Sequence, residues 1–143
     1  MSKKFRYYRY MDKISHAEHR IENIESWNLK YEALEDERTL LAIYKATQEV
    51  IERIMDLLAM YLRDTNKAPK DDYSNIKEAM KGKFITEEEQ NHLNEANGLR
   101  NRLIHDYNGL NDEKALESIS RLLPELQLIL KKVKEWSKRF FES

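Results

Sequence analysis

The sequence contains no cysteine, only three glycines and two prolines, and no long apolar run. Without cysteine the chain has no disulfide, no thiolate nucleophile and no cysteine ligand for zinc, which fits a cytoplasmic protein. No apolar stretch approaches the roughly 20 residues of a membrane-spanning helix, and the charged start lacks the apolar core of a signal peptide. We therefore expect a cytoplasmic chain without a membrane span.

The scarcity of glycine and proline also bears on the fold. The 143 residues are 41% hydrophobic and 36% charged, a mixture that amphipathic helices require, whereas β folds need many turn residues. The length suits one domain covering residues 1–143. We predict an all-α domain, an antiparallel four-helix bundle with one additional short helix.

Apolar residues at spacings of three and four predict where the helices lie. The expected ranges are about 10–27, 40–62, 73–80, 86 into the segment 98–107, and 112–141. Thr86 and Glu89 have the spacing of a capping box, and Pro124 is expected to kink or divide the last helix. The wide apolar faces of the second and last helices favour a homodimer.

The charges nearly cancel over the whole chain. A net charge of −1, from 25 basic and 26 acidic residues, argues against binding nucleic acid through the overall field, so any contact with RNA is expected to be local. The start KKFRYYRYMDK, residues 3–13, is both basic and aromatic. It suits RNA contact by stacking and phosphate pairing, and it equally suits a flexible tail or a helix whose tyrosines pack on the bundle.

One segment, GLRNRLIHDYN at residues 98–108, gathers polar groups on a predicted helix. On a helical wheel Arg100 and Tyr107 share the edge of the apolar seam. Asn101 and His105, four residues apart, form a neighbouring polar strip. No carboxylate is placed beside Arg100 to neutralise it, so we interpret this edge as suited to a phosphate.

These side chains fit the cleavage of RNA without metal. Arginine offers a planar fork for phosphate, and histidine exchanges a proton near neutral pH. His105 would take the ribose 2′-OH proton or protonate the leaving oxygen, while Arg100 stabilises charge on the phosphate. From spacing alone, such a set of residues is more often made of ordinary surface and core-edge side chains than of catalytic ones. His16, His19 and Glu22 are expected on a solvated helix face, so we expect no metal and no cofactor.

At these residues the chain resembles a known family. Arg100, four intervening residues, His105, one residue and Tyr107 match the R-x4-H-x-Y signature of HEPN domains of the HepT toxin type. Asn101 is the residue that commonly follows the arginine in that family. The resemblance extends from the first predicted helix to about Trp136 and so covers most of the chain.

A second arginine complicates the motif. Arg102 lies only three residues before His105, so the spacing favours Arg100 as the signature residue. Asp106 follows Arg102 at the i, i+4 spacing, which predicts an exposed ion pair between them.

The resemblance implies a homodimer whose two motifs face each other across a cleft, which would supply the second histidine. It implies a metal-independent ribonuclease with Arg100 and His105 as catalytic residues and Asn101 as a supporting one. It also implies a small nucleotidyltransferase antitoxin as partner, which in some systems transfers AMP to the tyrosine corresponding to Tyr107. The alternative is a non-catalytic helical binding module or the substrate-binding subunit of a nucleotidyltransferase.

Overall fold

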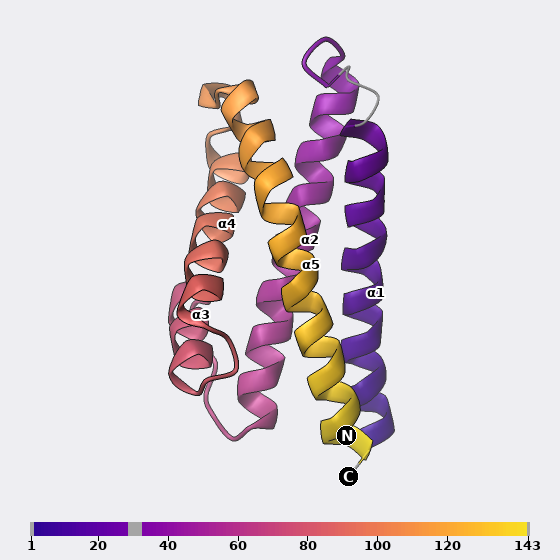
Figure 1. Cartoon of the computed structure of the whole chain (residues 1–143), viewed down its shortest axis with the longest axis vertical. Coiled ribbons are helices and arrows are strands. Elements are labelled where there is room, and N and C mark those ends of the chain that lie inside the picture. The colour runs from indigo at the N-terminus through magenta and orange to yellow at the C-terminus, as the bar shows by residue number, and fades with distance from the viewer. Residues whose placement is uncertain (1, 29–32, 143) are drawn as a thin grey trace.

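The computed structural model describes residues 2–28 and 33–142, and within these ranges it contains helices and no β-strand. The α-helices are α1 Lys3–Asn28, α2 Glu37–Asp64, α3 Asp72–Lys81, α4 Glu87–His105 and α5 Asp112–Glu142, with a 3-10 turn, η1, at Tyr107–Gly109. Four long helices run up and down side by side, and both chain ends lie at one end of the molecule (Figure 1). The predicted all-α four-helix bundle with one short extra helix is confirmed.

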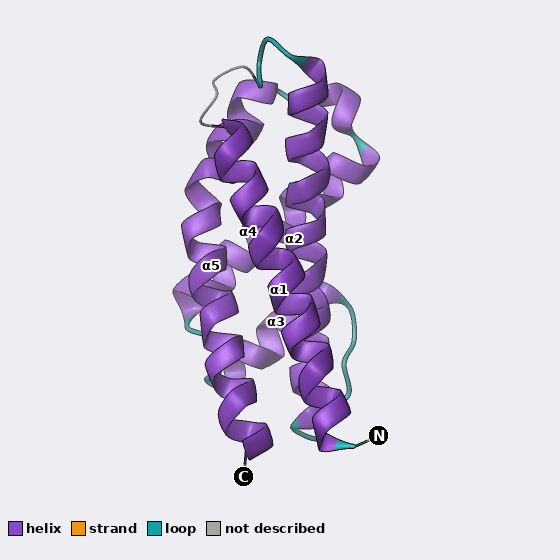
Figure 2. Cartoon of the chain, turned by 90° about the vertical axis from the view of Figure 1, so that its right-hand side faces the viewer, coloured by secondary structure: helices purple, strands orange, loops and turns teal. Residues whose placement is uncertain are grey.

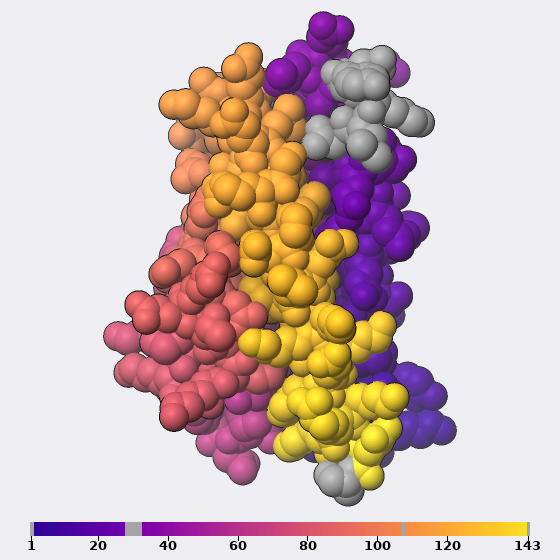
Figure 3. Space-filling model, in the orientation of Figure 1, coloured from indigo at the N-terminus to yellow at the C-terminus, as the bar shows by residue number. Residues whose placement is uncertain are grey.

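Helix α2 is the centre of the bundle. It contacts α1, α3, α4 and α5, and its apolar stripe is wide enough to bury residues toward all four neighbours. Ile54, Leu57 and Leu58 are fully buried at its middle. In the view turned by 90° the loops gather at the two ends of the bundle (Figure 2). On the face shown in Figure 3, α5 lies between α4 and α1.

Polar side chains mark the helix starts. Asp36 accepts a hydrogen bond from the backbone of Arg38 and caps α2. Thr86 and Glu89 form the predicted capping box at the start of α4, each side chain accepting from the other residue's backbone N–H. Of the stretch expected to connect the first two helices, residues 29–32 lie outside the described residues.

The basic, aromatic start of the chain is helical. Helix α1 begins at Lys3, earlier than expected, and Tyr10 is fully buried with its ring centroid 5.6 Å from that of Trp136. Tyr7 lies with its ring centroid 6.0 Å from that of Phe141 in α5. Of the two structural alternatives, the helix that packs its tyrosines on the bundle is observed and the flexible tail is not.

Pro124 does not divide the last helix, so that alternative is wrong. Helix α5 continues through it from Asp112 to Glu142. Proline inside a helix costs about 3 kcal/mol, because it lacks an N–H and crowds the preceding turn. Here the proline is exposed, while Leu123 and Leu126 on either side are buried and hold both halves of α5 against the bundle. Among the described helices, none combines the length and apolarity needed to cross a membrane.

Removing the cap of α4 tests how its start is stabilised. We expect Thr86→Ala to lower the free energy of unfolding by about 1 kcal/mol, because the backbone N–H of Glu89 loses its acceptor. Urea denaturation followed by circular dichroism measures the change. Thr86→Ser keeps the hydroxyl and serves as the control. An alanine variant as stable as the serine variant would contradict this account of the cap.

Candidate functional site

The arginine and histidine of the motif lie in the last turns of α4, and its tyrosine follows the end of the helix. Leu99 and Leu103 are buried and hold this end of the helix against the core. Arg100 is half-buried at the edge of that apolar seam, as the wheel predicted, whereas His105 is exposed at the last helical residue. The helix thus anchors the arginine firmly and presents the histidine to solvent.

A carboxylate from another helix holds Arg100. The Glu52 Oε2 atom in α2 accepts from Arg100 Nη2 at 2.8 Å and from Nε at 3.3 Å. The remaining Nη1 donates to Asn101 Oδ1 at 3.2 Å. The expectation that no carboxylate neutralises Arg100 is therefore wrong, because the wheel described one helix and Glu52 lies 48 residues away on its neighbour.

The protonation states around Arg100 follow from its charge. Burial acts to raise the pKa of Glu52, yet hydrogen bonds from Arg100 and Gln48 outweigh it and leave that pKa below its ordinary value. Burial raises the pKa of Asp72 at the start of α3, and the Arg100 charge opposes that rise. Glu52 is accordingly ionised at neutral pH and fixes the orientation of the guanidinium.

Tyr107 does not continue α4. The helix ends at His105, Asp106 is its C-cap with φ −146° and ψ 33°, and Tyr107 begins η1. The helical wheel does not apply beyond the end of the helix, so it no longer predicts on which face Tyr107 lies. The side chain of Tyr107 lies outside the described residues. The backbone nevertheless sets Tyr107 two residues after His105, directly beyond the end of α4.

The structure brings Arg100 and Asn101 together but does not join Arg100 to His105. No hydrogen bond or ion pair between those two is present in the described part of the chain. The two positions differ by about 140° around the helix. One motif alone therefore places its cation and its imidazole on different sides of α4.

The predicted ion pair between Arg102 and Asp106 is absent from the described residues, although Arg102 is exposed as expected. The Asp106 carboxylate instead lies beside Gly109, where an added Cβ would meet Oδ1 at 2.9 Å. Asp106 turns that way because α4 ends before it, which breaks the i, i+4 geometry. His92 is half-buried between α4 and α5, with Nδ1 3.5 Å from a Glu125 oxygen.

Sequence reasoning missed Glu52 and Asp72. Both lie dozens of residues from Arg100, on helices whose packing against α4 no local spacing reveals. In the sequence Glu52 is one more charged residue on the polar edge of an amphipathic helix. A helical wheel shows which residues of one helix share a face, so it cannot reveal an ion pair between two helices.

The ion pair between Arg100 and Glu52 should make the stability of the fold depend on pH. Glu52→Gln should lower the melting temperature most near neutral pH, where wild-type Glu52 is ionised and paired. Because the folded-state pKa is lowered, this stabilisation is present above the ordinary glutamate pKa of about 4.3 and is lost as the pH falls through the folded-state pKa. Melting curves from neutral pH down to about pH 3 should show the gap between wild type and variant shrinking.

Glu117→Gln is the matched control, because Glu117 is exposed and makes no hydrogen bond or ion pair with another described residue. The difference in melting temperature between Glu117→Gln and wild type should stay small at every pH. A Glu52→Gln gap that remains constant or widens toward acid would rule out the proposed ion-pair contribution.

Comparison with known proteins places the chain in a family. Residues 14–133 match the family described as ribonuclease HepT-like. A protein of Archaeoglobus fulgidus named as an inferred RNase is 32% identical over 127 residues, which cover 88% of this chain and 92% of that protein.

Two solved structures share the fold. A tri-AMPylated HEPN toxin from Shewanella oneidensis, solved in complex with MNT antitoxin, has a TM-score of 0.82 at 19% identity, covering 89% of this chain and 97% of that one. A toxin–antitoxin structure with AMP-PNP has a TM-score of 0.82 at 18% identity, covering 88% and 98%. The fold, the motif on α4 and the match over residues 14–133 together show that this chain belongs to the HepT-like ribonuclease family.

Proposed function

We propose that this chain is the toxin of a toxin–antitoxin pair and that it cleaves RNA without metal, using Arg100 and His105. The observation that carries the proposal is the pairing, on the last turns of α4, of a half-buried, oriented arginine with an exposed histidine. Membership of the HepT-like ribonucleases supplies the substrate class. The alternative of a non-catalytic binding module explains neither the oriented arginine nor the family.

The chemistry follows from the two side chains. The ribose 2′-oxygen attacks the adjacent phosphorus and the 5′-oxygen leaves. An imidazole takes the 2′-OH proton as a general base, or returns a proton to the leaving oxygen as a general acid. Arg100 donates to the phosphate oxygens as charge builds on them. Glu52 and Asn101 are positioning residues, because they orient the guanidinium and do not themselves contact the reacting atoms.

A homodimer completes the site. One histidine cannot act as acid and base in the same step, so a second motif supplies the other imidazole. Arg100 and His105 face different sides of α4, which leaves room for a second copy to approach the histidine side. Leu41, exposed on α2, lines a surface pocket with Leu103 near this end of α4, which gives the dimer an apolar contact.

Modification of Tyr107 regulates the proposed nuclease activity. The toxin in the Shewanella oneidensis complex is AMPylated and bound to an antitoxin. We propose that a small nucleotidyltransferase silences this chain by transferring AMP from ATP to the Tyr107 hydroxyl, with release of pyrophosphate. Tyr107 lies directly beyond the end of α4, two residues after His105. The added anion there would compete with substrate phosphate for the positive charge of the motif.

The nuclease test compares three arginine and histidine variants in EDTA. His105→Ala and Arg100→Ala should each reduce cleavage of single-stranded RNA by at least about 100-fold, because each removes a group that acts in the transition state. Arg102→Ala, two residues from Arg100 and exposed on the same helix, should retain activity within a few-fold. Cleavage is followed on end-labelled RNA, and melting temperatures establish that the variants are folded.

Two outcomes would overturn the nuclease proposal. One is unmodified wild-type protein that leaves RNA intact at stoichiometric concentration, which favours the binding-module alternative. The other is equal activity in His105→Ala and wild type, which moves catalysis away from the motif.

The modification test uses mass. Incubation with ATP and the proposed nucleotidyltransferase antitoxin should add whole AMP units to a peptide containing Tyr107 and abolish RNA cleavage. Tyr107→Phe should take up no AMP, while Tyr73→Phe, which changes an exposed tyrosine on α3, should be modified normally. AMP on another peptide, or silencing without any added mass, would refute Tyr107 as the acceptor.

A further inference from the structure

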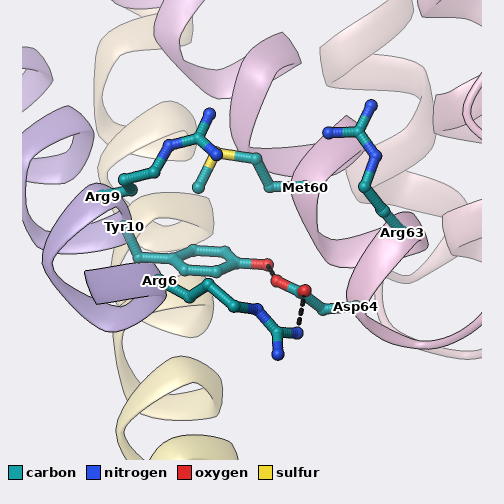
Figure 4. A pocket seen from close by; sticks show the side chains of 6 residues that line it. All are labelled: Arg6, Arg9, Tyr10, Met60, Arg63 and Asp64. Carbon is teal, nitrogen blue, oxygen red and sulfur yellow. Dashed lines mark hydrogen bonds and ion pairs between the residues drawn. The ribbon is translucent and has the colours of Figure 1, made fainter. Parts of the chain in front are cut away.

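A basic pocket lies at the terminal end of the bundle, away from the motif. It has a volume of about 360 Å³ and lies between the first turns of α1 and the last turns of α2 (Figure 4). Its lining consists of Arg6, Arg9, Tyr10, Met60, Arg63 and Asp64. Three arginines and a single carboxylate therefore line this pocket.

That carboxylate is already fully engaged. Asp64 accepts from the Arg6 guanidinium in an ion pair and from the Tyr10 hydroxyl at 2.7 Å. Burial and this hydrogen bond raise the pKa of Tyr10 far above its ordinary value, so the phenol remains a donor. Arg6 is further restrained, with its guanidinium carbon 5.3 Å from the centre of the Phe141 ring. Asp64 and Arg6 thus balance each other within the wall of the pocket.

Arg9 and Arg63 carry the charge that remains. Neither guanidinium group makes a hydrogen bond or ion pair with another described residue. In Figure 4 both guanidinium groups lie on the Met60 side of the pocket, one reaching from α1 and the other from α2. Two planar forks, one from each helix, suit an anion with several oxygens, and phosphate matches guanidinium geometry in particular.

The surroundings favour a nucleic-acid phosphate over an acidic protein. Phe5 is 53% exposed and lies one turn before Arg9 on α1, and Tyr8 is 58% exposed beside it. Exposed aromatic rings beside arginines stack with the bases of single strands. Residues 2–13, 60–70 and 131–142 lie at this end of the bundle and hold thirteen basic and four acidic residues, whereas the whole chain has a net charge of −1 (Figure 1). Three of these basic residues, Lys13, Lys132 and Lys134, pair with carboxylates of other segments.

The pocket is aligned with the motif along α2. Arg63 follows Glu52, the partner of Arg100, by 11 residues. That separation is about 17 Å along the helix axis and about 20° around it, so both positions lie on one face of α2. Asp56 lies on the same face between them. It is paired with Lys13 at 3.1 Å, so it adds little net repulsion of an RNA phosphate. An extended single strand of several nucleotides can follow this face from one position to the other.

We propose that Arg9 and Arg63 form a phosphate-binding site for single-stranded RNA, which holds the substrate several nucleotides away from the point of cleavage. The site rests on the proposed ribonuclease function for its substrate, and it has no part in the chemical step. Phe5 and Tyr8 stack with bases of the held strand. The positive terminal end thereby attracts RNA that the acidic remainder of the chain repels.

Binding to a catalytically inactive background tests the site without depending on cleavage. In protein carrying His105→Ala, the further pair Arg9→Ala and Arg63→Ala should weaken binding of a labelled single-stranded RNA of about 20 nucleotides by about tenfold. The slope of log affinity against log salt should become shallower by about one, because phosphate contacts are lost. Affinity is measured by fluorescence anisotropy.

The matched control removes the same charge elsewhere. Arg38→Ala with Lys114→Ala deletes two exposed basic residues near the opposite end of the bundle and should leave the affinity within about twofold. For an RNA of about three nucleotides, too short to span the two positions, the two double variants should bind equally well. Arg9→Lys with Arg63→Lys, which keeps charge but loses the fork, should fall between wild type and the alanine pair.

The possible results separate this site from the cleavage proposal. Unchanged affinity and salt slope in the alanine pair overturn the RNA site, and so does an equal loss in the control pair, which would indicate a general charge effect. If the pocket holds an acidic protein segment, RNA affinity is likewise unchanged. Failure of wild-type protein to cleave RNA concerns only Arg100 and His105. Melting temperatures verify folding, and the lysine pair provides the decisive comparison if the alanine pair is unstable.

Discussion

The burial of α2 against every other helix is the constraint on which the rest of the structure depends. Its apolar face is too wide to be covered by one neighbour, so α1, α3, α4 and α5 all pack around it. Burying large side chains such as Ile54 and Leu57 sets the rotation of α2 about its own axis. That rotation leaves a polar edge carrying Glu52 toward α4, and the position of Arg100 follows from it.

The proposed site combines one rigidly held side chain, Arg100, with one exposed side chain, His105. Arg100 is held by Glu52 and Asn101, so its guanidinium needs little reordering when a phosphate arrives. His105, at the last residue of α4, is exposed and can be reached by substrate or by a second copy. The end of α4 matters for the same reason, since the backbone leaves the helix before Tyr107 and sets that residue in a separate turn.

Charge is distributed unevenly along the bundle, although the net charge of the chain is close to zero. The terminal end carries an excess of basic residues, whereas Arg100 lies near two carboxylates, Glu52 on α2 and Asp72 at the start of α3. Within the basic end, Asp64 engages Arg6 and Tyr10 and so leaves two arginines without a carboxylate. A nearly neutral chain can in this way offer one local surface to a polyanion and still keep most of its surface unattractive to it.

The sequence by itself determined the helices and the capping box of α4, and its spacing favours Arg100 over Arg102 as the signature residue. These depend on spacings of three and four residues, which a helix converts directly into shared faces. It also carried the motif by which the family is recognised. The tertiary structure alone decided that Glu52 holds Arg100, that Asp106 turns to Gly109 instead of Arg102, and that α5 passes through Pro124 undivided. The pairing with Glu52 and the continuity of α5 rest on packing between helices far apart in the chain, and the turn of Asp106 on where α4 ends. A pattern within one segment contains neither the packing between helices nor the exact end of a helix. The core fixes both only when the helices assemble.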